Sequence, residues 1–256
     1  MRNTFIYFGM LFLLLGMATA SIQAQEAAPQ KFIVFEEIVS PADLPAFIET
    51  QTKVKALWDK HNLSIPIFSY RNDDNAFYWV VPIHSFASID TLYASMMAMH
   101  QKMIDEDGFD ADLAFKDLYY GEQSIIKWSK ELSYHPSGQM GQSMDQPYSE
   151  WTFCYLKAGH EKEAAEAIKK YIDFYDRIEE TYEWDIYITL LGEGTPLWIL
   201  MTRSKNPVSL KQLENDLYMK YGKEFTEMWS NFSKHVRKVD NKTGWFQPKF
   251  SINLPE

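Results

Sequence analysis

The sequence predicts an α+β protein that contains two similar units in one chain. Two stretches, residues 66–82 and 184–202, each hold two runs of β-branched and aromatic residues around a polar turn, which is the pattern of a β-hairpin. Matching landmarks also recur at a spacing of about 120 residues, which indicates a duplication. These landmarks are Phe32 and Phe153, Tyr78 and Trp198, and Ser88 and Ser209.

The first unit is predicted over residues 31–135. Its first helix begins at Ser40 and Pro41, because serine is a favoured cap and proline suits the first turn. Its elements in order are a strand at 31–39, a helix ending near Asn62, the hairpin at 66–82, a helix from Ser88, a helical piece at 112–127 and a short strand at 131–135.

A linker is predicted at residues 136–147, because this stretch is rich in Pro, Gly and Ser. The second unit is then predicted over residues 148–256. Its elements in order are a strand at 149–156, a helix from Gly159, the hairpin at 184–202, a helix from Ser209, a helix around Phe225 and a strand at 244–251.

This element order resembles the ferredoxin-like plan, and its duplication resembles the dimeric α+β barrel superfamily. That superfamily includes antibiotic-biosynthesis monooxygenases, stress-response barrel proteins, NIPSNAP-like proteins and chlorite-dismutase-like haem proteins. The resemblance covers roughly residues 31–253 and depends on element order and duplication. It implies two ferredoxin-like units that pack as a pseudo-dimeric barrel, and it carries over no catalytic residue.

The first residues have the pattern of a secretory signal peptide. Arg2 precedes an apolar run, and small residues offer cleavage after Ala20 or Ala24. The run is shorter than the roughly 20 residues that a membrane span needs. We therefore expect residues 1–24 to be removed, which leaves a periplasmic or extracellular protein without stable membrane insertion. The single Cys154 excludes an internal disulfide and favours a bacterial host.

Composition and charge narrow the function classes. Hydrophobic residues make up 46% of the 256 residues and aromatic residues 16%, which predicts a large core. The formal net charge of -10, without a basic run, disfavours nucleic-acid binding. The chain also lacks the sequence motifs of a nucleophile elbow, a phosphate-binding loop or a zinc protease. The sequence determines neither whether the protein is an enzyme nor its oligomeric state.

Aromatic residues on the hairpins are the candidate ligand-binding residues. In the first unit these are Tyr70 and Trp79 with the nearby His84, and in the second they are Tyr187 and Trp198. The first unit is favoured, because a histidine can bind or transfer protons near neutral pH. We expect the concave face of each sheet to meet the helices, with the ligand between them. The alternative is that all these rings form an aromatic core.

A methionine-rich helical face is the weak candidate for a metal site. Met96, Met99, His100 and Met103 share this face, and thioethers with imidazole suit Cu(I). The alternative, which we favour, is that the methionines fill gaps in a core. No metal is therefore predicted.

The best functional prediction is an exported protein that binds a small molecule. One alternative is a barrel enzyme, either oxygenase-like or haem-dependent, and another is a periplasmic copper binder. No cofactor is predicted, although the resemblance to haem-binding barrels implies that His160 or His235 could be an axial ligand.

Overall fold

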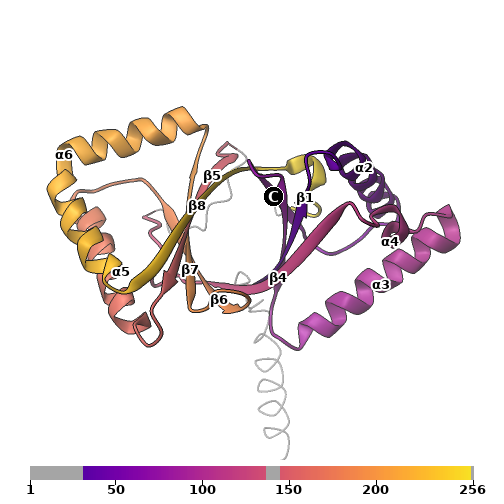
Figure 1. Cartoon of the computed structure of the whole chain (residues 1–256), viewed down its shortest axis with the longest axis horizontal. Helices are drawn as coiled ribbons and strands as arrows, with labels where there is room; N and C mark the ends of the chain where they lie inside the picture. The colour runs from indigo at the N-terminus through magenta and orange to yellow at the C-terminus, as the bar shows by residue number, and fades with distance from the viewer. Residues whose placement is uncertain (1–30, 137–144, 255–256) are drawn as a thin grey trace, which may run out of the picture.

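The computed structural model describes residues 31–136 and 145–254. It forms a closed eight-stranded barrel with helices on two opposite sides (Figure 1). The predicted signal region and most of the predicted linker lie outside the described residues. No described helix is both long and apolar enough to span a membrane.

Each unit supplies four strands and the helices on its own side of the barrel (Figure 1). The first unit contains β1 (Lys31–Val39), α2 (Leu44–Lys60), β2 (Phe68–Asn72), β3 (Ala76–Ile83), α3 (Ser88–Asp107), α4 (Ala111–Ala114) and β4 (Tyr119–Trp128). The second unit contains β5 (Tyr148–Leu156), α5 (Glu161–Arg177), β6 (Trp184–Leu191), β7 (Leu197–Ser204), α6 (Pro207–Ser233), β8 (Val236–Phe246) and the short 3-10 helix η1 (Pro248–Phe250).

The strand order confirms two tandem ferredoxin-like units. Within the first unit the order is β4-β1-β3-β2, and within the second it is β8-β5-β7-β6. Antiparallel pairing of β2 with β8 and of β4 with β6 joins the two sheets into one barrel. The closed arrangement leaves no sheet edge unpaired along this ring, which removes a common route to aggregation.

Alternation along the strands divides the core into three layers. On β3, Tyr78 points into the barrel, whereas Phe77 and Trp79 point outward to the helices. One apolar cluster lines the barrel interior, and one lies between each sheet and its own helices. The prediction that helices meet the concave face is therefore wrong: they cover the outer, convex face, because barrel closure makes the concave faces of both sheets line one interior.

Several predicted boundaries differ from the structure. The helix expected at 112–127 is limited to α4, because residues 119–128 form β4 between β1 and β6. The strand expected at 131–135 is reduced to one isolated bridge at Tyr134. The last strand runs over 236–246 rather than 244–251, since α6 ends at Ser233. The two helices expected from Ser209 and around Phe225 form one helix, α6, which is kinked at Tyr221 (φ -133°, ψ 22°).

Candidate functional site

Two cavities lie back to back on the sheet of the second unit. The helix-covered cavity, about 260 Å³ in volume, lies between the outer face of that sheet and helices α5 and α6. The barrel cavity, about 390 Å³, lies on the inner face and takes its walls from both units. Strand β7 contributes to both, because Ile199 faces the barrel cavity and Leu200 faces the helix-covered cavity.

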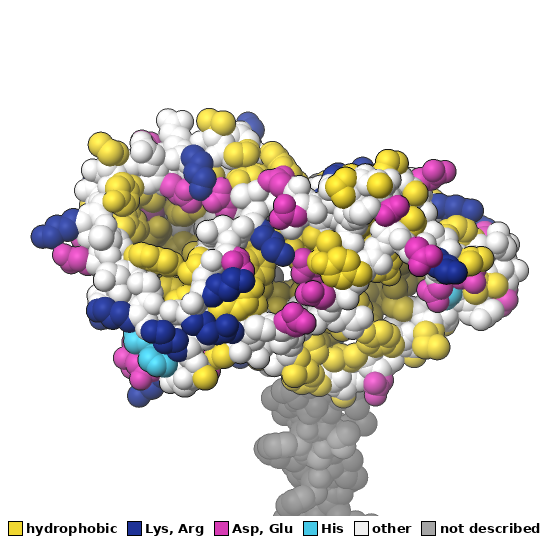
Figure 2. Space-filling model, viewed as in Figure 1, with side chains coloured by type: hydrophobic (Ala, Val, Ile, Leu, Met, Phe, Trp, Pro, Cys, Tyr) yellow, Lys and Arg dark blue, Asp and Glu magenta, His cyan; other side chains and the backbone are white. Residues whose placement is uncertain are grey.

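Aromatic side chains form most of the helix-covered cavity. Figure 2 shows a hollow beside α6 whose visible walls are largely hydrophobic. Trp184 and Trp198 reach it from adjacent strands, β6 and β7, and tyrosines reach it from α5. The lining residues used below are Cys154, Tyr171, Tyr175, Tyr182, Leu200 and Glu214.

A few polar groups interrupt this apolar wall. The Tyr182 hydroxyl is buried, and although the Thr202 side chain lies close enough to influence it, no hydrogen bond of normal geometry satisfies it in the described structure. Burial raises the pKa of Tyr182 and Tyr175, so both are neutral phenols near neutral pH. Burial also raises the pKa of the Cys154 thiol to about 12, which leaves it protonated and unreactive. Glu214, 2.9 Å from Lys211, is a carboxylate on the wall.

Helix α6 covers this cavity and carries exposed aromatic residues at its opening. Tyr218 lies just before the kink and Trp229 lies in the half after it, and both line the cavity while remaining exposed. Exposed apolar side chains that gather in one place often mark a binding site, so the position of these two rings at the cavity mouth suits contact with a ligand.

The barrel cavity has charged groups at its mouth and aromatic rings within. The Tyr78 hydroxyl donates a 2.7 Å hydrogen bond to Glu36. Lys242 lies 3.1 Å from Glu36 Oε1 and 3.0 Å from the Tyr78 oxygen. Tyr70 and Tyr187 line the cavity further in.

A buried ion-pair cluster lies beyond these tyrosines. Asp185 is 0% exposed, and its carboxylate is 2.6 Å from Arg203, 2.7 Å from His135 Nε2 and 2.7 Å from Trp128 Nε1. Burial acts to raise the pKa of Asp185, but Arg203 and His135 together hold it below its usual value. The sequence analysis did not predict this cluster. Its signal was one charged residue at an inward position on each strand of the second hairpin, Asp185 on β6 and Arg203 on β7.

The structure separates the predicted ligand-binding residues. Tyr70 and Tyr187 lie together inside the barrel, where both line the same cavity. Trp198 lines the helix-covered cavity on the other side of the sheet. Trp79 lies in the core of the first unit, and His84 is exposed. The site predicted for the first unit is therefore divided among three environments.

In the core of the first unit, Trp79 is hydrogen-bonded to a glutamate whose pKa is raised. Its indole N–H donates a 2.6 Å hydrogen bond to Glu37. Burial raises the pKa of Glu37 from 4.5 to about 7, against the opposing effects of the Trp79 and Tyr119 hydrogen bonds. The Glu37 carboxyl group therefore titrates near neutral pH.

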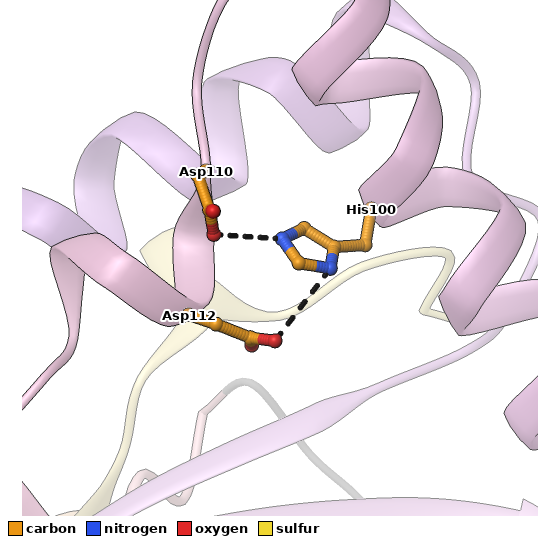
Figure 3. A group of neighbouring side chains, drawn as sticks. All are labelled: His100, Asp110 and Asp112. Atoms are coloured by element: carbon orange, nitrogen blue, oxygen red, sulfur yellow. Dashed lines mark hydrogen bonds and ion pairs between the residues drawn. The ribbon is translucent and has the colours of Figure 1, made fainter.

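The methionine stripe is divided between core and surface. Met99 and Met103 are buried among the helices and sheet of the first unit, and Met96 packs against that cluster. His100 turns instead to Asp110, at 3.3 Å, and Asp112, at 3.8 Å (Figure 3). These three could surround an ion, but the Asp110 carboxylate already caps α4 by accepting from the Leu113 N–H. Oxygen ligands are also not those that Cu(I) prefers.

The described residues do not fit a haem held by histidine. His160 and His235 face each other, with their Nδ1 atoms 3.0 Å apart, and neither lines a cavity. No histidine of the described chain lines either of the two cavities. Ligation by the Cys154 thiol or the Tyr171 phenol would require that group to be deprotonated, and burial raises the pKa of both groups.

Comparison with solved structures identifies the fold. An anthrone oxidase-like protein is similar with a TM-score of 0.58 and 10% identity, over 85% of this chain and 92% of that one. A proposed monooxygenase from Lactobacillus acidophilus NCFM is similar with a TM-score of 0.50 and 10% identity, over 88% of this chain and 100% of that one. Another from Fusobacterium nucleatum subsp. nucleatum has a TM-score of 0.50 and 12% identity, over 84% and 91%.

The chain thus shares the α+β barrel fold of these three solved structures, with both ferredoxin-like units in one polypeptide. No family model matches the sequence, and no curated protein matches it. At these identities the similarity shows the fold alone.

Proposed function

We propose that this protein binds a small, largely apolar ring compound in the helix-covered cavity of the second unit. The observation that carries the proposal is a 260 Å³ cavity with aromatic walls that contains the unsatisfied hydroxyl of Tyr182. An unsatisfied buried hydroxyl costs roughly 1–3 kcal/mol, and a ligand that hydrogen-bonds to it would recover that free energy. Mostly apolar pockets with a few polar groups are typical ligand sites.

The contrast between the units supports this choice. In the first unit, Phe47, Phe77 and Met103 fill the matching space between sheet and helices and are essentially inaccessible. In the second unit, the matching layer leaves a cavity and places Tyr218 and Trp229 at its opening. Duplicated units that differ in this way suggest one structural copy and one binding copy.

The test uses 2-naphthol, a neutral aromatic probe with one hydroxyl, in calorimetric titrations. Leu200→Phe fills the helix-covered cavity and should weaken binding at least tenfold. Ile199→Phe, on the next residue of the same strand, fills the barrel cavity and is the matched control, so binding should be unchanged. Tyr182→Phe should weaken binding several-fold, because it removes one hydrogen bond. Loss of binding in Ile199→Phe alone would refute the assignment.

Oxygenase activity is the second candidate. It is supported by the fold shared with monooxygenase-like proteins and by Glu214, a cavity carboxylate that could remove a substrate proton. Anthrone is a suitable probe, since one similar structure is anthrone oxidase-like. Oxygen consumption above the rate in buffer, lost in Glu214→Gln, would favour the enzyme. Binding without oxygen consumption would favour the binding protein.

Export belongs to the same proposal. The sequence pattern of residues 1–24 supports a function outside the cytoplasm, where the cavity would meet ligands from the surroundings of the cell.

A further inference from the structure

The barrel cavity has the properties of a second binding site. Its inner walls are apolar, formed by Val34, Ile126, Ile199, Met201 and Trp151. At the far end, Tyr70 and Tyr187 separate it from Arg203, whose charge Asp185 neutralises at 2.6 Å. The interior therefore offers no net charge, and it suits the apolar part of a ligand.

One polar group in this wall has no partner. Thr189 is only 7% exposed, lines the cavity, and its buried hydroxyl makes no hydrogen bond within the described residues. A threonine hydroxyl can accept from an N–H donor or donate to an acceptor. A ligand with a polar end near this position would satisfy it.

The charged side chains at the mouth of the barrel cavity determine which charge the polar end of a ligand should carry. Both lysines that line the cavity already have acidic partners: Lys242 pairs with Glu36 at 3.1 Å, and Lys238 pairs with Asp240 at 2.7 Å. Glu122 and Glu193 line the same mouth, and neither forms an ion pair in the part of the chain that the structure describes. Arg237 also lies at this mouth, 5.4 Å from the ring centre of Tyr155 and donating a 2.8 Å hydrogen bond to the Gly194 carbonyl, and it has no acidic partner among the described residues. Two unpaired glutamates against one arginine leave a negative balance, in a chain whose net charge is -10. Figure 2 shows acidic and basic side chains gathered near the centre of the molecule.

The aromatic rings at this mouth already contact cations. Lys238 lies 4.9 Å from the ring centre of Tyr155, and Lys242 lies 5.7 Å from that of Tyr78. These contacts hold the lysine ammonium groups against the rings, so the two unpaired glutamates are the groups left to select a ligand by its charge. A ligand ammonium group would pair with them, whereas a carboxylate would be repelled.

We propose that the barrel interior binds small amphipathic amines, with the ammonium group at the mouth near Glu122, Glu193 and Thr189 and the apolar body inside the barrel. This site is separate from the helix-covered cavity and does not depend on it.

Two probes with the same body and opposite charge test the proposal. Calorimetric titration with 4-phenylbutylammonium and with 4-phenylbutanoate, at neutral pH and low salt, should show at least tenfold tighter binding of the ammonium. Raising the salt concentration should weaken that binding, because exposed charges are screened. Equal or tighter binding of the carboxylate would overturn the proposal.

Variants locate the site. Ile199→Phe should abolish ammonium binding, whereas Leu200→Phe should leave it within twofold, which is the opposite of the result expected with 2-naphthol. Combined Glu122→Gln and Glu193→Gln should weaken binding several-fold, and these exposed positions leave folding intact. Thr189→Val should also weaken binding while the melting temperature is kept or raised, since an unsatisfied hydroxyl is removed. Unchanged affinity in the glutamate and Thr189 variants, or loss in Leu200→Phe, would refute the location.

Discussion

Replacing Glu37 with glutamine should remove a pH dependence of stability between about pH 4.5 and 7. The pKa of Glu37 is raised from 4.5 to about 7 in the folded protein. The folded state therefore binds this proton more tightly than the unfolded state does. The stabilisation is fully present below pH 4.5 and is lost as pH rises through 7. Each pH unit corresponds to about 1.4 kcal/mol, so the full loss is about 3 kcal/mol.

The assay is urea denaturation of the wild type and of Glu37→Gln at several pH values from 5 to 8. Other titrating groups act equally on both proteins, so the difference between their free energies of unfolding isolates Glu37. The variant should gain stability relative to the wild type as pH rises, by about 2–3 kcal/mol over this range. Glu49→Gln, at an exposed position of α2, is the control and should show no such trend. A constant difference for Glu37→Gln would refute the reasoning.

Three further predictions concern other parts of the chain. Asp185→Asn should cost about 3–5 kcal/mol of stability by urea denaturation, because it leaves Arg203 buried without its counter-ion; a cost below 1 kcal/mol would contradict the buried pair. Gly244→Ala should lower the melting temperature, because its Cβ would lie 2.6 Å from a backbone oxygen of β2 at the seam between the units, whereas Gly121→Ala, with its nearest contact at 3.5 Å, should be tolerated. N-terminal sequencing of the mature protein should begin at Ser21 or Gln25, and an intact Met1 in the cytoplasm would contradict export.

The duplication and the hairpins made the fold predictable. Turn signals and β-branched runs depend on local residues, so both hairpins were recognisable in the sequence. Strand β4 was not, because the spacing of its apolar residues also suits a helix. Its state is determined by hydrogen bonds to β1 and β6, which lie far from it in sequence. Non-local pairing of this kind leaves little trace in a local pattern.

The candidate sites were less predictable than the fold. Alternation places Tyr78 and Trp79 on opposite faces, but only barrel closure decides which face meets the helices. The cavity beside Trp198 exists because the packing of α5 and α6 leaves space that the equivalent helices of the first unit fill. Cavity volume is a small difference between large packed volumes, and residue spacing does not encode it.

The wall between the two cavities is a single layer of strands. Odd-numbered side chains of β7, such as Ile199, belong to one compartment, and even-numbered ones, such as Leu200, belong to the other. Point substitutions can therefore change the contents of one compartment while leaving the other intact, so the two can evolve separately. A single-residue insertion in β7 would instead exchange the linings beyond it, turning outward side chains inward. This strand should tolerate substitution far better than a change of length.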